Sequence, residues 1–154
     1  MTIRTRDATA DDREFAIATA RRLADFGPPI WRSPLDIVTG EVRTLDDFFD
    51  GSTTGSSLMI AEEESGIRLG FVYVETLIDY FSSEPHGHVG MIAVASAAEG
   101  RGVGRVLMEA AEAWARSHGF SRLTLNVFAG NARARAFYET LDFAVETLRY
   151  VKNL

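Results

Sequence analysis

The sequence contains no cysteine and only one lysine, Lys152. The absence of cysteine excludes disulfides, thiolate metal sites and a catalytic thiol. A phosphate-binding P-loop needs a Gly-Lys-Ser/Thr segment, and no such segment occurs. No apolar run approaches the length of a membrane helix, and the first residues lack the apolar core of a signal peptide. We therefore expect a cytoplasmic protein with no membrane partner.

Basic residues are too few to give the chain a positive charge. The formal net charge is −6, which argues against a nucleic-acid partner, so an anionic ligand would be held by local geometry rather than by the overall field. The 154 residues are 46% apolar, which suffices for one domain, residues 1–154, with a sizeable core. No repeat or low-complexity linker interrupts the chain.

Alternate glycines at Gly100, Gly102 and Gly104 follow an apolar run and precede a helical pattern. The N–H groups that open a helix have no partner within it, and the helix dipole adds positive charge there, so this junction is suited to an anion such as a cofactor phosphate. A dinucleotide fold would need glycine at Arg105 and an acidic residue about 20 positions later, and it fits poorly. A tight turn with glycines kept for packing is the alternative.

Two segments carry a more specific pattern. Residues 99–104 read Glu-Gly-Arg-Gly-Val-Gly, and residues 131–143 read Asn-Ala-Arg-Ala-Arg-Ala-Phe-Tyr-Glu-Thr-Leu-Asp-Phe. In order and spacing they resemble the pyrophosphate loop, [Q/R]-x-x-G-x-[G/A], and the second signature, N-x-x-A-x-x-x-Y-x-x-x-G-F, of the GNAT superfamily of acyl-CoA-dependent N-acetyltransferases. Glu99 departs from the first motif and Asp142 from the second.

Periodicity and turn residues predict a mixed α/β (α+β) fold. Strands are expected at residues 3–8, 57–62, 68–77, 88–94, 122–128 and 145–152. Helices are expected from a capping box at Asp11 and Glu14 to about Phe26, from Ser33 onward, and at residues 102–118 and 131–141. The third helix should bury Val103, Val106, Leu107, Ala110 and Trp114. The resemblance implies a twisted mixed sheet flanked by helices, whose fourth and fifth strands splay apart to admit the pantetheine arm of coenzyme A.

The resemblance also implies that acetyl-CoA is the acyl donor and indicates its contacts. The backbone of Ile92 and Val94 would bind the pantetheine and the thioester carbonyl. Arg105 and Arg135 are the preferred pair for the 3′-phosphate, and Asn131 is either a ligand contact, an N-cap or both. The full set of expected cofactor contacts is Ile92, Val94, Gly100, Arg101, Gly102, Val103, Gly104, Arg105, Asn131, Arg135 and Tyr138.

Tyr138 stands where the family places its general acid, and a phenol of pKa about 10 is protonated at neutral pH. His88 lies where the histone-acetyltransferase branch carries its basic glutamate, and an imidazole can take a proton from an ammonium at neutral pH. Glu75, Asp79 or a water chain are the alternative bases. His86 and His88 form an H-x-H pair, but without a third ligand we expect no metal site.

The sequence thus predicts acetylation of a primary amine by direct attack on acetyl-CoA in a ternary complex. A catalytically weak or inactive acyl-CoA-binding sensor or interaction domain is one alternative, and a nucleotide-binding regulatory domain is another. The acceptor, a small-molecule or a protein amine, is left open, as is the oligomeric state, a homodimer included. Its pocket should come from residues 26–32, the third-to-fourth strand loop and the C-terminal strand.

Overall fold

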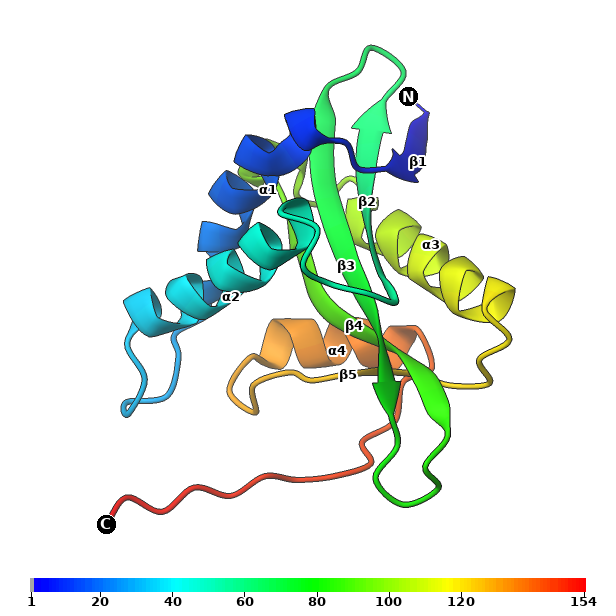
Figure 1. The fold of residues 1–154 in the computed structure, drawn as a ribbon. Coiled ribbons are helices and arrows are strands. Elements are labelled where there is room, and N and C mark those ends of the chain that lie inside the picture. Colours follow the sequence, from blue (N-terminus) through cyan, green and yellow to red (C-terminus); the bar gives the residue numbers. More distant parts are fainter. Residues whose placement is uncertain (1) are drawn as a thin grey trace.

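One five-stranded sheet, in the order β1-β2-β3-β4-β5, runs through the computed structural model, which describes residues 2–154 (Figure 1). The strands are β1 (Ile3–Asp7), β2 (Ser56–Glu63), β3 (Arg68–Ile78), β4 (Pro85–Val94) and β5 (Leu123–Leu125). The helices are α1 (Arg13–Ala20), α2 (Pro34–Phe49), α3 (Val103–Ser117) and α4 (Ala132–Thr140), with short 3₁₀ turns η1 (Ala10–Asp12), η2 (Arg21–Ala24) and η3 (Ser96–Ala98). Within residues 2–154, none of the helices is long and apolar enough to cross a bilayer.

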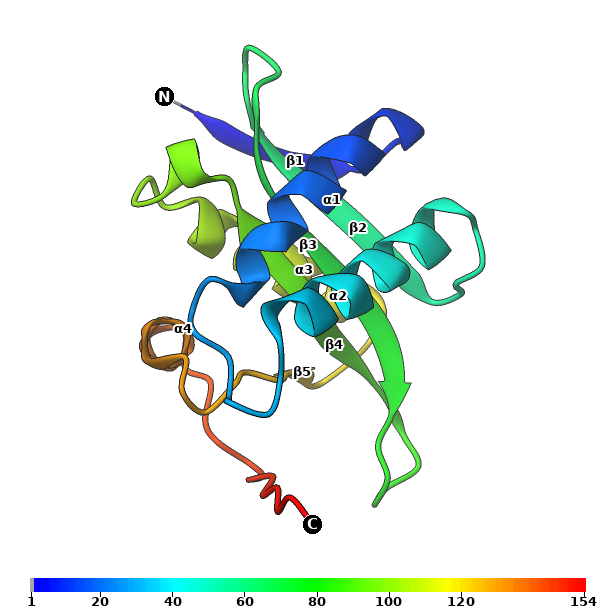
Figure 2. The ribbon, with the colours of Figure 1, turned by 90° about the vertical axis from the view of Figure 1, so that its left-hand side faces the viewer.

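Helices cover both faces of the sheet, with α1 and α2 on one face and α3 on the other (Figure 2). A hydrophobic core lies on each face of the sheet, and β3 contributes side chains to both. Successive side chains of a strand point to opposite faces. Phe71 packs in the core beneath α1 and α2, whereas Val72 and Val74 pack in the core beneath α3. This two-sided burial explains why β3 is a continuous apolar run rather than an alternating one.

The order of helices and strands from β1 to α4 confirms the predicted mixed fold. The second helix also starts as predicted, since Ser33 caps it by accepting the N–H of Asp36 at 3.0 Å and Pro34 follows at the first position. The first capping box was predicted two residues too late. Thr9 is the N-cap, and its backbone N–H is bound by the carboxylate of Asp12 at 2.7 Å.

Helix α3 buries a face that is rotated from the predicted one. Val103 and Leu107 are buried as expected, but Met108, Ala111 and Ala115 complete the buried face. The other predicted positions, Val106, Ala110 and Trp114, are only partly buried. Ala110 and Trp114 pack at the margin of the same core, so the buried face of α3 is shifted by about one residue from the predicted one.

Strand β5 is shorter than predicted and pairs with β4 for only three residues. The parallel register is Gly87↔Leu123, His88↔Thr124 and Val89↔Leu125, and β4 then continues alone to Val94. The predicted divergence of the fourth and fifth strands is thereby confirmed. It leaves the outer edge of β4 unpaired from Gly90 onward.

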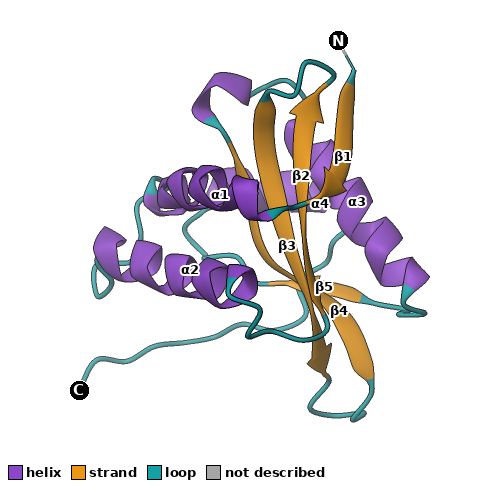
Figure 3. Cartoon of the chain, turned by 45° about the horizontal axis from the view of Figure 1, so that its top comes forward, coloured by secondary structure: helices purple, strands orange, loops and turns teal. Residues whose placement is uncertain are grey.

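The predicted strand at residues 145–152 is not formed. Beyond Phe143 the chain carries no strand or helix and leaves the body as an extended segment (Figures 1 and 3). The sheet ends at β5, so no neighbouring strand supplies hydrogen bonds to this segment. The sequence pattern predicts the local extended conformation correctly. Strand pairing also requires a neighbouring strand edge, and the sheet of residues 2–154 provides none for this segment.

An ion-pair network fastens the N-terminal strand to the first turn. Asp12 is fully buried, and its carboxylate accepts two hydrogen bonds from Arg6, at 2.8 and 3.0 Å, and one from Arg68 at 2.6 Å. Arg6 also binds Glu62 on β2 at 2.9 Å. The hydrogen bonds from Arg6 hold the pKa of Asp12 well below its usual range, with further help from the N–H of Thr9.

Replacing Asp12 with asparagine should destabilise the protein by about 3 kcal/mol at neutral pH, because the arginines lose their buried counter-charge. A carboxyl whose pKa is lowered by folding contributes stability above its unfolded pKa of about 3.9 and loses it as the pH falls below that value. Urea unfolding of Asp12→Asn should therefore show a weaker acid dependence than the wild type below about pH 4. The control is Asp46→Asn, in a more exposed pair with Arg13, which should change little. An equal effect of the two substitutions would contradict the role of the network.

Candidate functional site

The parting of β4 from β5 exposes the backbone that was predicted to hold a thioester. Ile92 and Val94 lie on the part of β4 that extends beyond its pairing with β5, with β3 on its other side. The carbonyl of Val94 already accepts an N–H from the guanidinium of Arg22. A ligand arm that enters this opening can therefore pair with β4 as an added strand would, once it shares or displaces the contact at Val94.

A β-bulge lies at the point where the two strands separate. Val74 pairs with Val89 and Tyr73 with Met91, so Gly90 is an extra residue with no partner on β3. A Cβ atom at Gly90 would come within 2.9 Å of both the Glu75 carboxylate and the Tyr73 ring. Bulges turn the backbone and re-aim side chains beside active sites. An isolated glycine inside a strand pattern is the sequence signal for this feature, and the predictions did not use it.

His88 and Glu75 come together at this point. They are register partners on adjacent antiparallel strands, which places their Cβ atoms about 5 Å apart on the same face. Glu75 is partly buried, and this burial raises the pKa of its carboxyl. His88 is almost fully buried, and both this burial and the neighbouring His86 lower the pKa of its imidazole. Two of the predicted bases therefore lie side by side.

The hydroxyl of Thr124 on β5 anchors both histidines. Its oxygen lies 2.8 Å from Nδ1 of His88 and 3.0 Å from Nε2 of His86. Because a hydroxyl has one proton, at least one imidazole must donate its N–H to this oxygen. If His88 donates from Nδ1, its Nε2 carries the free lone pair that a general base requires. This network accounts for the H-x-H pair.

The third predicted base is committed elsewhere. The Asp79 carboxylate accepts the backbone N–H groups of Phe81 at 3.1 Å and Ser82 at 2.8 Å. These bonds form the turn between β3 and β4 and lower the pKa of Asp79. Asp79 is therefore a turn residue, and we do not include it in the proposed catalytic group.

The glycine loop has the geometry of an anion site. Gly100 and Gly102 have φ angles of +73° and +81°, which favour glycine, and no heavy atom lies within 4 Å of an added Cβ at either position. The first helical bond of α3 runs from the N–H of Val106 to the carbonyl of Gly102 at 3.2 Å. The N–H groups of the preceding residues, 103–105, thus have no carbonyl of their own helix and point ahead of it.

Glycine is required at position 104 for a different structural reason. A Cβ there would lie 3.3 Å from the Phe137 ring, so this glycine allows α3 and α4 to approach closely. Packing and anion binding, which the sequence left as alternatives for the glycines, are thus divided between neighbouring positions. Substitution of Gly104 would disturb the helix contact and is a poor probe of ligand binding.

The charge of Glu99, which departs from the family motif, is balanced by an arginine that the sequence analysis did not identify. The guanidinium of Arg22 on η2 forms an ion pair with the Glu99 carboxylate. This hydrogen bond lowers the pKa of Glu99, and the charge of Arg133 on α4 adds to the effect. Arg22 lies 77 positions away in the sequence, so no local pattern could have linked the two.

Two of the three arginines predicted to contact the cofactor bind other groups of the chain. Arg101 donates to Glu63 at 2.5 Å, and Arg135 donates to the carbonyl of Ala129 at 3.0 Å in the loop before α4. Arg105 is exposed in the first turn of α3. Arg22 and Arg133 are thus the cations that act on Glu99, at the start of the glycine loop.

Helix α4 positions the second signature. Asn131 is its N-cap and accepts the N–H of Ala134 at 3.2 Å, which confirms the capping role and leaves its amide N–H groups available. Tyr138 is partly buried between Phe137 and Phe143, and this burial raises the pKa of its hydroxyl. Within residues 2–154 that hydroxyl has no protein partner and no buried polar side-chain atom is unsatisfied, so it reaches solvent. The Tyr138 hydroxyl is therefore protonated at neutral pH and can donate a hydrogen bond to a ligand.

The Asp142 departure also has a structural explanation. Its φ angle is +67°, in the left-handed region that favours glycine. Aspartate and asparagine are the side chains that tolerate this region best. The backbone conformation is therefore kept without the glycine.

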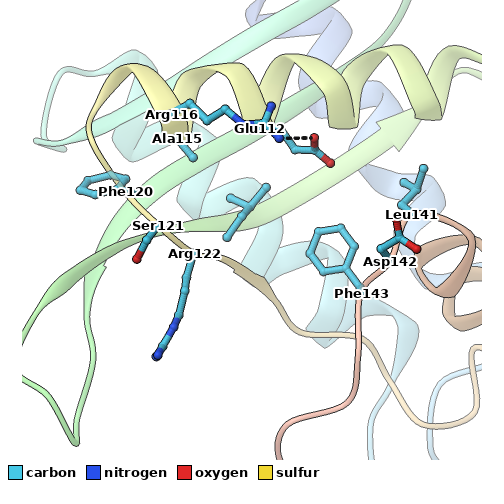
Figure 4. Close-up of a pocket in the computed structure, with 10 residues that line it drawn as sticks. Glu112, Ala115, Arg116, Phe120, Ser121, Arg122, Leu141, Asp142 and Phe143 are labelled. Atoms are coloured by element: carbon cyan, nitrogen blue, oxygen red, sulfur yellow. Dashed lines mark hydrogen bonds and ion pairs between the residues drawn. The ribbon is translucent and has the colours of Figure 1, made fainter.

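The segment predicted to shape an acceptor pocket, residues 26–32, contacts the chain that follows β5. Phe26, just after η2, stacks on Phe128, just after β5, with ring centroids 5.1 Å apart. Trp31 in the same segment is half exposed. A separate hollow of about 370 Å³ lies at the opposite end of α3 from the glycine loop, where Phe143 faces Phe120 and Ser121 across it (Figure 4).

The chain matches the model of a known family. The sequence model of the acetyltransferase (GNAT) family matches residues 24–143. A mycothiol acetyltransferase of Jonesia denitrificans is 39% identical over 84 residues, which cover 53% of this chain and 24% of that protein. A 5-NmdU N-acetyltransferase of Pseudomonas phage PaMx11 is 40% identical over 86 residues, 56% of each chain. The chain spans a third or less of the mycothiol acetyltransferases that it matches and just over half of the phage protein.

Solved structures show the same fold. A putative acetyl transferase from Pyrococcus furiosus has a TM-score of 0.81 at 20% identity, with 99% of this chain and 100% of that chain covered. Glucosamine-6-phosphate N-acetyltransferase from Arabidopsis thaliana has a TM-score of 0.69 at 16% identity, with 99% of each chain covered. At these identities the likeness concerns the fold.

The buried position of His88 gives a prediction about pH. Its imidazole should titrate below the ordinary value of about 6.5 and be neutral at pH 7. Since folding lowers this pKa, the contribution of His88 to stability is complete above about pH 6.5 and is lost as the pH falls toward the folded pKa. NMR titration of the histidine side chains, with His88→Gln to assign the resonance, measures the midpoint. A midpoint at or above 6.5 would show that the imidazole is not desolvated.

Proposed function

The chain belongs to the GNAT acetyltransferase family, and we propose that it transfers an acetyl group from acetyl-CoA to a primary amine. The observation that carries the proposal is the alignment of two features along one side of β4. The unpaired backbone around Ile92 and Val94 adjoins the glycine loop, whose free N–H groups open α3. A linear ligand with a thioester at one end and phosphates at the other matches this arrangement.

The residues fit the anionic half of acetyl-CoA. Open space at Gly100 and Gly102 lets a pyrophosphate approach the backbone, and the dipole of α3 favours its charge. Arg22 forms an ion pair with Glu99 at the start of the loop. The positive charge of Arg22 therefore reduces the repulsion between the Glu99 carboxylate and the phosphates. Arg101, Arg105, Arg133 and Arg135 are the other cations near the two helix starts, of which Arg105 and Arg135 are proposed for the 3′-phosphate.

Acetyl-CoA supplies an acyl group already activated as a thioester. His88, through Nε2, takes the proton of the attacking ammonium, and Glu75 is the alternative acceptor beside it. The backbone N–H groups of β4 at the bulge and beyond it stabilise the oxygen that gains charge at the thioester carbon. Tyr138, kept protonated by burial, donates a proton to the departing thiolate. Holding both reactants in one opening supplies orientation.

The alternative of an inactive acyl-CoA sensor rested on the motif departures and on the uncertain base. Glu99 has an arginine partner, Asp142 keeps the left-handed backbone of a glycine, and His88 adjoins Glu75. No observation now favours the alternative over transfer. The acceptor itself is proposed only as a primary amine that enters beside the Phe26–Phe128 pair.

Acetyl-CoA should raise the melting temperature of the wild type, whereas NAD and ATP should not. A ligand present at 100 times its Kd stabilises the native state by about 2.7 kcal/mol. Gly102→Asp should remove most of this shift because a carboxylate would face the pyrophosphate.

The matched control is Gly119→Asp, at the other end of α3. Gly119 also has a left-handed φ, +75°, and no heavy atom within 4 Å of an added Cβ, so the backbone cost is comparable. Its ligand-induced shift should equal that of the wild type. Equal shifts in both variants would remove the glycine loop from the site, and no shift with acetyl-CoA in the wild type would refute the proposed cofactor.

Tyr138→Phe keeps the ring and removes the proton donor, so kcat should fall about 10²- to 10⁴-fold with little change in the KM for acetyl-CoA. Release of free thiol over a panel of primary amines measures the rate. Tyr80→Phe, on the exposed turn after β3, should leave it unchanged.

The same assay tests the base. His88→Gln should abolish the acid limb of the pH–rate profile, which in the wild type should lie below pH 6.5. If the limb persists in His88→Gln and disappears in Glu75→Gln, the carboxylate is the base.

For the test of the acid, a wild-type rate in Tyr138→Phe would show that the thiolate leaves without a proton from Tyr138.

A further inference from the structure

Arg22 contacts both halves of the proposed cofactor site. It lies on η2, and its partly buried guanidinium donates through Nη1 to the carbonyl of Val94 and through Nη2 to the carboxylate of Glu99. Val94 is the last residue of β4, and Glu99 is the first residue of the glycine loop. One side chain from the opposite end of the sequence therefore bridges the strand and the loop along which the cofactor is proposed to bind.

The backbone geometry of β4 places the Val94 contact in the opening. The N–H of Ala95 donates to the carbonyl of Leu69 on β3 at 2.8 Å. In a trans peptide the carbonyl points opposite to the N–H of the same peptide unit, so the carbonyl of Val94 points away from β3. That side of β4 is unpaired, because its pairing with β5 ends at Val89. Arg22 thus reaches the edge on which the pantetheine arm is proposed to lie.

The guanidinium of Arg22 has more N–H donors than these contacts use. Within residues 2–154 its other N–H groups have no protein acceptor. A guanidinium is planar and positively charged, and its fork of donors matches two oxygens of a phosphate. Because Val94 and Glu99 hold both terminal nitrogens, the group is oriented before a ligand arrives, which lowers the entropy cost of binding.

The order of groups in coenzyme A indicates which phosphate Arg22 would meet. The pantetheine arm is joined directly to the pyrophosphate, whereas the 3′-phosphate is carried by the ribose beyond it. A residue between the β4 edge and the first residue of the glycine loop lies where the arm meets the pyrophosphate. The family motif has glutamine or arginine at position 99, and Glu99 itself cannot donate a hydrogen bond when ionised.

Screening of the Glu99 charge is the simpler role for Arg22, and two observations favour a contact with the ligand. The bond to the Val94 carbonyl is not needed to balance a carboxylate, but it does fix the guanidinium at the opening. Arg133 on α4 also lowers the pKa of Glu99 through its charge, so Arg22 is not alone in screening this carboxylate.

We propose that Arg22 binds the pyrophosphate of acetyl-CoA directly and that Glu99 holds its guanidinium in place. The side chain that the family motif carries at position 99 is then replaced by a pair, an acid in the loop and a base on η2. The pantetheine arm shares or displaces the contact at Val94, while Glu99 keeps the guanidinium beside the loop. This assignment rests on the proposed cofactor and adds a binding residue to its site.

Calorimetric titration with CoA, dephospho-CoA and pantetheine tests the assignment without turnover. Arg22→Gln should weaken CoA and dephospho-CoA by the same factor, about tenfold or more, because both lose a hydrogen bond between charged groups. Pantetheine has no phosphate, and it should bind Arg22→Gln at least as tightly as the wild type because the Val94 carbonyl is released. The matched control is Arg21→Gln, which removes the same charge from an exposed position on the same turn and should change none of these affinities.

A pair of further variants separates direct binding from screening. Glu99→Gln keeps an oxygen that can accept an N–H from Arg22 but removes the negative charge, so it should bind CoA at least as tightly as the wild type. Adding Arg22→Gln to Glu99→Gln should still weaken CoA about tenfold. If the added substitution has no effect, Arg22 acts only by screening Glu99, and the proposal is wrong.

A variant that keeps the charge guards against loss of folding. Arg22→Lys can still form an ion pair with Glu99 but lacks the planar fork. It should weaken CoA and dephospho-CoA by less than Arg22→Gln does and leave pantetheine binding unchanged. If Arg22→Gln weakens pantetheine as much as CoA, the substitution has disturbed the opening and the proposal is overturned.

The wild type distinguishes this proposal from the proposed function. A wild-type chain that binds none of the three ligands would refute the cofactor itself. Wild-type binding of CoA together with an unchanged CoA affinity in Arg22→Gln would overturn only the role of Arg22 and leave the proposed cofactor in place.

Discussion

The three-residue parallel pairing between β4 and β5 is the constraint on which the rest of the molecule depends. It starts at Gly87↔Leu123 and stops at Val89↔Leu125, where the bulge at Gly90 turns β4 away. On the inner side this separation exposes the β4 backbone as a place for a ligand to pair. It also keeps β5 short, because the strand is only as long as its pairing with β4. The opening beside β4 and the short fifth strand are therefore two consequences of the same early end of pairing.

The motif departures show that the geometry of a site can be kept while its residue types change. At position 99 the side chain that the family provides is replaced by an acid, and a guanidinium from η2 restores the local charge balance. At position 142 the left-handed φ of +67° survives because aspartate tolerates it. Gly104 matches the family motif, but here the glycine is needed for the close contact between α3 and α4. The same residue at a motif position can therefore have a different structural role.

Features determined by neighbours in sequence were predictable. Element order, the caps at Ser33 and Asn131 and the divergence of the fourth and fifth strands follow from local patterns and from the family resemblance. Features determined by distant contacts were not. The Arg22–Glu99 pair joins positions 77 apart, and the bond from Arg68 to the buried Asp12 joins positions 56 apart. Gly90 in β4 and the Thr9-x-x-Asp12 spacing carried local signals that were overlooked.

The strand predicted at residues 145–152 was right about the extended conformation and wrong about strand pairing. A strand pattern specifies an extended conformation and a face, but its hydrogen bonds need an edge supplied from elsewhere. Open edges and exposed apolar strands are hazards that folded proteins cover. Among residues 2–154, β5 is the last strand of the sheet and no strand pairs with its outer edge, so residues 145–152 are extended without forming a ladder.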